Sequence, residues 1–101
     1  MAKVLENIEP KKVFKYFEDI SKIPRGSKNE EQISDYLVQF AKDRGLEYIQ
    51  DEFLNVIIKK TGTSGYENAP TVILQGHMDM VCEKNEDTEH DFSKDPLKLR
   101  V

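Results

Sequence analysis

Cysteine is nearly absent from this sequence, which has one such residue, Cys82, among its 101. A single cysteine excludes a framework of internal disulfides and is typical of proteins of the reducing cytoplasm. Long apolar runs are also missing, since no stretch approaches the roughly 20 residues that a membrane-spanning helix needs. The first residues mix charged and apolar side chains, so we expect no signal peptide. These absences predict a soluble cytoplasmic protein without a membrane partner.

An excess of basic charge is missing as well. The sequence carries 15 lysine and arginine side chains against 19 acidic ones, a formal net charge of −4. Nucleic-acid binding relies on a basic face that displaces counterions from phosphates, so we expect no nucleic-acid partner. A chain of this length can bury one modest core. We therefore expect no second domain within residues 1–101.

Two helices are predicted in the first half of the sequence. Pro10 is tolerated in a first helical turn, and apolar residues then recur near helical spacing until Pro24, which disfavours helical geometry at the residue before it. Ser27 and Glu30 fit a capping box at the start of the second helix. The apolar stripe of that helix consists of Ile33, Tyr36, Leu37, Phe40 and Ala41. Gly45 stands where a left-handed residue commonly ends a helix.

After the second helix the periodicity becomes that of β-strands. Residues 46–50 and 55–60 predict two short strands. Residues 71–75 (TVILQ) are a continuous apolar run, which is typical of a strand buried on both faces of an α/β sheet. A partial fourth strand is expected at 97–101, whereas residues 82–96 are polar and acidic and predict a surface loop. The predicted fold class is α/β, with two helices followed by three to four strands of an incomplete sheet.

His77 and Asp79 are the residues with the clearest chemical content. They follow the run at 71–75, and open α/β sheets bind ligands at the carboxyl ends of their strands. In an extended chain, residues two apart face the same side, so the two side chains can reach each other. A carboxylate that holds one imidazole nitrogen is the usual partner of a zinc-bound histidine. The pair is therefore a candidate metal site. From these residues alone, a polar strand end without function is the favoured interpretation, because one ligand does not make a site.

Two further residues are candidates for metal binding. Cys82 could ligate a metal or act as a redox thiol, but the favoured interpretation is a small buried hydrophobe. His90 lies in the acidic segment, where a solvated residue or one at the rim of a substrate site is favoured. The surrounding acidic residues lack the alternating oxygen ligands and the glycine of a calcium loop. We expect this segment to be a solvated surface.

Residues 72–85, with the sequence VILQGHMDMVCEKN, closely resemble the aminoacyl-histidine dipeptidases (Xaa-His dipeptidases). These enzymes belong to the aminoacylase and carboxypeptidase-G group of di-zinc metallopeptidases. Residues 21–27 (SKIPRGS) resemble the entry of the same family into its second helix, and the resemblance extends from about Pro10 to the last residue. It implies that His77 binds one zinc ion, and that Asp79 orients this histidine and is catalytic.

The resemblance also implies the nature of the whole enzyme. Such a dipeptidase holds two zinc ions per complete active site, where cobalt or manganese could substitute, and hydrolyses Xaa-His and related dipeptides by a metal-activated water. The other metal ligands and the general base of the family are not recognisable in residues 1–101. These residues are therefore interpreted as an N-terminal fragment of a three-layer α/β/α catalytic domain. We expect the isolated chain to be inactive and either self-associating or marginally stable, and the parent enzyme is compatible with a homodimer.

Two other functions stay open from the sequence. The chain could be a fragment of a sibling tripeptidase, although residues 82–85 favour the dipeptidase branch. It could also be a complete small domain that binds a partner without catalysis, an interpretation that only the length supports.

Overall fold

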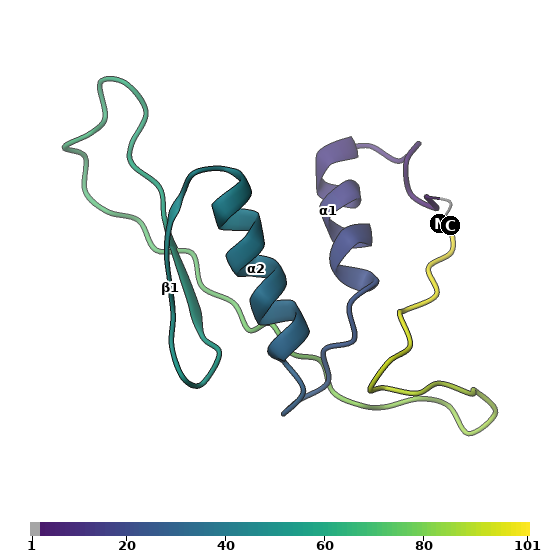
Figure 1. Cartoon of the computed structure of the whole chain (residues 1–101). Helices are drawn as coiled ribbons and strands as arrows, with labels where there is room; N and C mark the ends of the chain where they lie inside the picture. Colours follow the sequence, from purple (N-terminus) through teal and green to yellow (C-terminus); the bar gives the residue numbers. More distant parts are fainter. Residues whose placement is uncertain (1–2) are drawn as a thin grey trace. The chain divides into compact units, whose positions relative to one another are not determined.

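The computed structural model describes residues 3–101, in which two helices precede two strands (Figure 1). The helices are α1 (Lys11–Ser21) and α2 (Glu31–Asp43), and the strands are β1 (Glu47–Gln50) and β2 (Val56–Lys59). The chain divides into two compact units. The first contains the residues up to Ile33 together with Asp79–Val101, and the second is Ser34–Met78. Neither helix of the described residues is long and apolar enough to cross a membrane.

Helix α1 confirms the first predicted helix, and Glu18 attaches the preceding segment to it. Glu18 is 6% exposed, and its two carboxylate oxygens accept the backbone N–H groups of Val4 and Leu5, each at 2.8 Å. These backbone hydrogen bonds, first from Val4 and then from Leu5, lower the pKa of Glu18 because they stabilise the ionised carboxylate. Leu5 is thereby held in a buried position.

Helix α2 begins at Glu31, later than the predicted capping box requires, so that prediction is wrong. Lys28 has a φ of 70°, which a helix cannot contain. Glu30 accepts the backbone N–H of Lys28 at 2.6 Å, and the hydroxyl of Ser27 donates to Asp79. Ser27 does not cap the helix because the left-handed backbone at Lys28 interrupts the first turn that the capping box requires.

The end of α2 is the one that the sequence predicts. Gly45 has a φ of 65°, and its N–H donates to the carbonyl of Lys42 at 3.1 Å. The N–H of Leu46 donates to the carbonyl of Ala41 at 2.9 Å. Together these bonds form a Schellman motif, which needs a left-handed residue at the position of Gly45.

Strands β1 and β2 confirm the two strands predicted at 46–50 and 55–60. They form an antiparallel hairpin with Gln50 opposite Val56. Asp51 closes the connecting turn, because its carboxylate accepts bonds from the side chain and backbone of Asn55 and from the backbone of Phe53, all at 2.9 Å. The side-chain bond from Asn55 is the main reason why the pKa of Asp51 is lowered.

The hairpin lies beside α2 in Figure 1, and Ser34 of α2 is hydrogen-bonded to it. The side chain of Ser34 is 0% exposed. Its hydroxyl donates to the carbonyl of Leu54 at 2.7 Å and accepts a bond from the Gln50 amide at 2.8 Å. Leu54 has a φ of 69°, so the bond to its carbonyl holds a residue in a conformation that its own side chain disfavours.

The strands predicted at 71–75 and 97–101 are not formed, and these predictions are wrong for the described residues. Val72, Ile73 and Leu74 are 80%, 83% and 94% exposed. A strand buried on both faces needs paired strands at its edges and layers that cover it, and the described sheet contains only β1 and β2. The α/β class with an incomplete sheet is confirmed, but the described sheet has two strands.

Candidate functional site

Asp79 lies where two segments that are far apart in the sequence, residues 25–27 and 79–80, meet. The N–H of Met80 donates to the carbonyl of Arg25 at 2.8 Å, and the N–H of Ser27 donates to the carbonyl of Met80 at 3.1 Å. Gly26 and Met80 therefore form a parallel β-bridge. Both segments belong to the first compact unit. The bridge therefore holds the backbone next to Ser27 and next to Asp79.

Asp79 accepts a short hydrogen bond from Ser27. The Oγ atom of Ser27 lies 2.6 Å from Oδ2 of Asp79, whereas the carbonyl oxygen of Met80 is farther from the same hydroxyl, at 3.5 Å. Asp79 is half-buried. A hydroxyl that donates to a carboxylate at this distance makes a charge-assisted bond, so it restricts the rotation of the carboxyl group.

Gly26 allows the bridge to form next to Cys82. Gly26 is buried, and a Cβ atom at this position would lie 2.5 Å from the Sγ atom of Cys82. Any side chain at this position would displace the thiol or the backbone. Cys82 itself is exposed, so its prediction as a buried hydrophobe is wrong. The reason is that residues 81–89 run along the surface and all of them are exposed.

Arg25 secures the other end of the bridged loop. Its guanidinium donates through Nη1 to the carbonyl of Ile20 in α1. Partial burial lowers the pKa of Arg25, because the charged form loses hydration. The loop that contacts Asp79 is thus joined to α1 at Arg25 and to residues 79–80 at Ser27.

His77 is exposed and lies in a segment without regular secondary structure. It belongs to the unit Ser34–Met78, whereas Asp79 begins the final segment of the other unit. The structure therefore describes the two residues in separate units. The contact between the His77 and Asp79 side chains stays a prediction.

His90 is half-buried and packs against Phe92, with ring centroids 4.9 Å apart in an edge-to-face arrangement. Together with Arg25, Glu83 and other residues of the first unit, it lines a cavity of about 80 Å³. Within residues 3–101, no three histidine, cysteine or acidic side chains come together as metal ligands. A catalytic zinc ion usually has three protein ligands, so these residues do not fit a complete metal centre.

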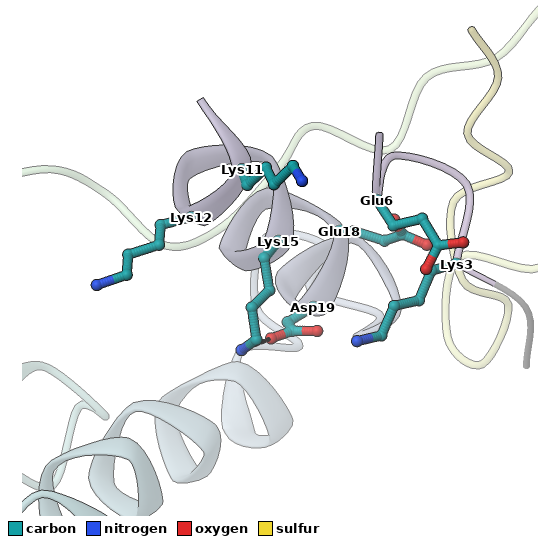
Figure 2. Close-up of a pocket in the computed structure, with 7 residues that line it drawn as sticks. All are labelled: Lys3, Glu6, Lys11, Lys12, Lys15, Glu18 and Asp19. Atoms are coloured by element: carbon teal, nitrogen blue, oxygen red, sulfur yellow. Dashed lines mark hydrogen bonds and ion pairs between the residues drawn. The ribbon is translucent and has the colours of Figure 1, made fainter. Parts of the chain in front are cut away.

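A larger cavity, of about 180 Å³, lies between α1 and the segment before it. Figure 2 shows Lys15 beside Asp19, and Lys3 near Glu6 and Glu18, while Lys12 extends away from them. Lys15 and Asp19 form an ion pair at 3.3 Å. Both cationic and anionic side chains line this cavity, so it does not present a single sign of charge to a ligand.

Neither Ser27 nor Arg25 was predicted as a site residue from the sequence. Ser27 was interpreted as a helix cap, and its bond to Asp79 joins residues 52 positions apart. The available signal was indirect: residues 21–27 and 72–85 are the two segments with the same family resemblance. That shared resemblance is compatible with the contact between them but does not specify it.

Comparisons with known proteins give two relatives. No protein-family model matches the chain. The chain is 43% identical over 94 residues to the cytosol non-specific dipeptidase of Escherichia coli strain K12, a match that covers 93% of this chain and 19% of the relative. The crystal structure of the aminoacylhistidine dipeptidase from Vibrio alginolyticus matches with a TM-score of 0.91 and 40% identity, over 98% of this chain and 20% of that one. The chain thus spans about a fifth of the length of these relatives.

Proposed function

Because the chain is a homologue of the aminoacyl-histidine dipeptidases along nearly its whole length, we propose that it acts as part of a longer dipeptidase. The observation that carries this proposal is the 43% identity over 93% of the chain. The structural match at a TM-score of 0.91 supports it independently of the sequence motifs. Residues 1–101 are then one part of a single catalytic domain, and the reaction is hydrolysis of the peptide bond of a dipeptide.

The proposed substrates are Xaa-His dipeptides and related dipeptides. The name of the solved relative supports the first group, and the name of the curated relative, a non-specific dipeptidase, supports the wider range. Residues 82–85 (CEKN) support the same branch, since they resemble it more than the tripeptidases. The proposed location is the cytoplasm, in agreement with the word "cytosol" in the name of the curated relative and with the single Cys82.

We assign metal binding to His77 and a catalytic, histidine-orienting role to Asp79. An imidazole with a carboxylate partner is donor chemistry that zinc accepts. Two zinc ions per complete active site are proposed, with cobalt or manganese as substitutes. The described residues contain no set of three metal-ligating side chains, so the missing ligands would come from other parts of a longer polypeptide. No catalytic step is therefore assigned to this chain alone.

Self-association of the isolated chain is a further part of the proposal. The apolar side chains of residues 72–74 are 80–94% exposed, and an uncovered apolar segment of this kind favours association between chains. In the longer enzyme this segment would be covered by the remaining fold. A homodimeric parent is compatible with this interpretation.

The test is an assay of the longer protein that contains this chain. We expect hydrolysis of Gly-His and of dipeptides without histidine, loss of activity after chelation, and recovery on addition of zinc. His77→Ala is expected to reduce the zinc content measured by elemental analysis, and Asp79→Asn to abolish hydrolysis with the zinc content largely kept. A metal-loaded longer protein that hydrolyses no dipeptide would refute the proposed function.

A further inference from the structure

Ser27 has a role in the structure beyond that of a loop residue. Its hydroxyl donates to Oδ2 of Asp79 at 2.6 Å. We infer that Ser27 is a positioning residue, which holds the Asp79 carboxylate in the orientation that the dipeptidase reaction needs. This inference rests on the proposed function, in which Asp79 is the catalytic residue. Nothing in the family resemblance assigns this role to the serine.

The backbone around the two residues is fixed without the hydroxyl. The N–H of Met80 is bonded to the carbonyl of Arg25, and the carbonyl of Met80 is bonded to the N–H of Ser27. Gly26, which is buried, brings the two segments together because its missing side chain leaves room for Cys82. Removal of the Ser27 hydroxyl therefore leaves the bridge intact and changes the freedom of the Asp79 carboxylate.

The hydroxyl of Ser27 contributes a restraint on the orientation of the Asp79 carboxylate. An ionised carboxylate has two oxygens and accepts hydrogen bonds along about four lone-pair directions. The bond from Ser27 to Oδ2 restrains rotation of the carboxyl group and so limits the directions in which its oxygens can accept other bonds. Orientation matters because removal of the hydrogen-bonding partners behind metal ligands typically lowers metal affinity or activity by about 10- to 100-fold.

A second serine–aspartate bond in the same unit provides a comparison. Ser93 Oγ donates to Asp91 Oδ1, also at 2.6 Å. That bond joins residues two positions apart, as is common in turns formed by aspartate and serine. The bond between Ser27 and Asp79 joins residues 52 positions apart. The two bonds have the same chemistry and length, but only the bond from Ser27 involves the proposed catalytic carboxylate, Asp79.

The test uses the longer dipeptidase with the variants Ser27→Ala, Ser27→Thr and Ser93→Ala. For Ser27→Ala we expect kcat to fall about 10- to 100-fold with KM unchanged, because the interaction acts on the transition state. Ser27→Thr keeps the hydroxyl and is expected to restore kcat, and Ser93→Ala is expected to resemble the wild type. Thermal melting of all variants measures whether folding is altered.

Several outcomes would overturn the inference. One is full kcat in Ser27→Ala; another is an equal loss in Ser27→Ala and Ser27→Thr, which would indicate a structural effect of the position. Asp79→Asn separates this inference from the proposed function. If Asp79→Asn is inactive and Ser27→Ala is fully active, the positioning role is wrong and the dipeptidase function stands. If the wild type hydrolyses no dipeptide, the function is wrong and the positioning role fails with it.

Discussion

Replacement of Ser34 by alanine tests how the hairpin is attached to helix α2. The side chain of Ser34 is 0% exposed, and the substitution removes one oxygen atom while the methylene group stays as a methyl group. The carbonyl of Leu54 loses its donor at 2.7 Å, and the Gln50 amide loses its acceptor at 2.8 Å. The change therefore affects hydrogen bonding much more than packing.

The expected magnitude follows from what remains after the substitution. The Gln50 amide also donates to Asp35 at 3.1 Å, so it keeps one partner. The carbonyl of Leu54 is the group that is left unsatisfied, and an unsatisfied buried polar group costs about 1–3 kcal/mol. We expect Ser34→Ala to lower the free energy of unfolding by about 1–2 kcal/mol, because this group is only partly buried.

The assay is urea denaturation followed by circular dichroism, together with amide hydrogen exchange of residues 54–56. Exchange should accelerate in the turn, because Leu54 adopts a φ of 69° that the lost bond helped to hold. Ser64→Ala, at an exposed position of the same unit, is the control and should change stability by less than about 0.5 kcal/mol. If Ser34→Ala behaved like this control, the reasoning from the two part-buried hydrogen bonds would be wrong.

Three other predictions follow from the same structure. Gly45→Ala should destabilise the chain by about 1–2 kcal/mol, measured by urea denaturation, because alanine is strained at a φ of 65°; no change would contradict the Schellman ending. The pKa of Glu18 is lowered by its two backbone bonds, so the stability that it contributes is present above its ordinary pKa of 4.5 and is lost as the pH falls through the lowered value. Glu18→Gln should make the melting temperature less dependent on pH in that acidic range. If the melting temperature of Glu18→Gln varied with pH as that of the wild type does, the contribution assigned to the Glu18 carboxylate would be wrong. The isolated chain should bind zinc weakly and substoichiometrically in calorimetry; His77→Ala should remove this binding and His90→Ala should keep it, whereas tight binding of two zinc ions per chain would show that the ligand set is misjudged.

The similarity to dipeptidases and the local structure were predictable from the sequence. The resemblance of residues 72–85 to the aminoacyl-histidine dipeptidases agrees with both relatives found by comparison. The two helices, the hairpin strands and the left-handed Gly45 also follow the sequence pattern. These features depend on interactions between residues only a few positions apart, such as the two bonds that end α2. Hydrophobic periodicity and the residues at helix ends reflect such short-range interactions, so they can be identified in the sequence.

The surroundings of Asp79 were decided by the tertiary structure. Ser27 fits a capping box by its local sequence, yet the left-handed backbone at Lys28 prevents the box from forming. Its hydroxyl instead donates to a carboxylate 52 positions away. Residues 71–75 fit a buried strand, but burial depends on neighbouring strands and covering layers that the described residues do not provide. Cys82 is exposed because residues 81–89 lie at the surface. Local sequence patterns were sufficient to specify the helices and the hairpin, whereas contacts between distant segments set which partners their residues meet.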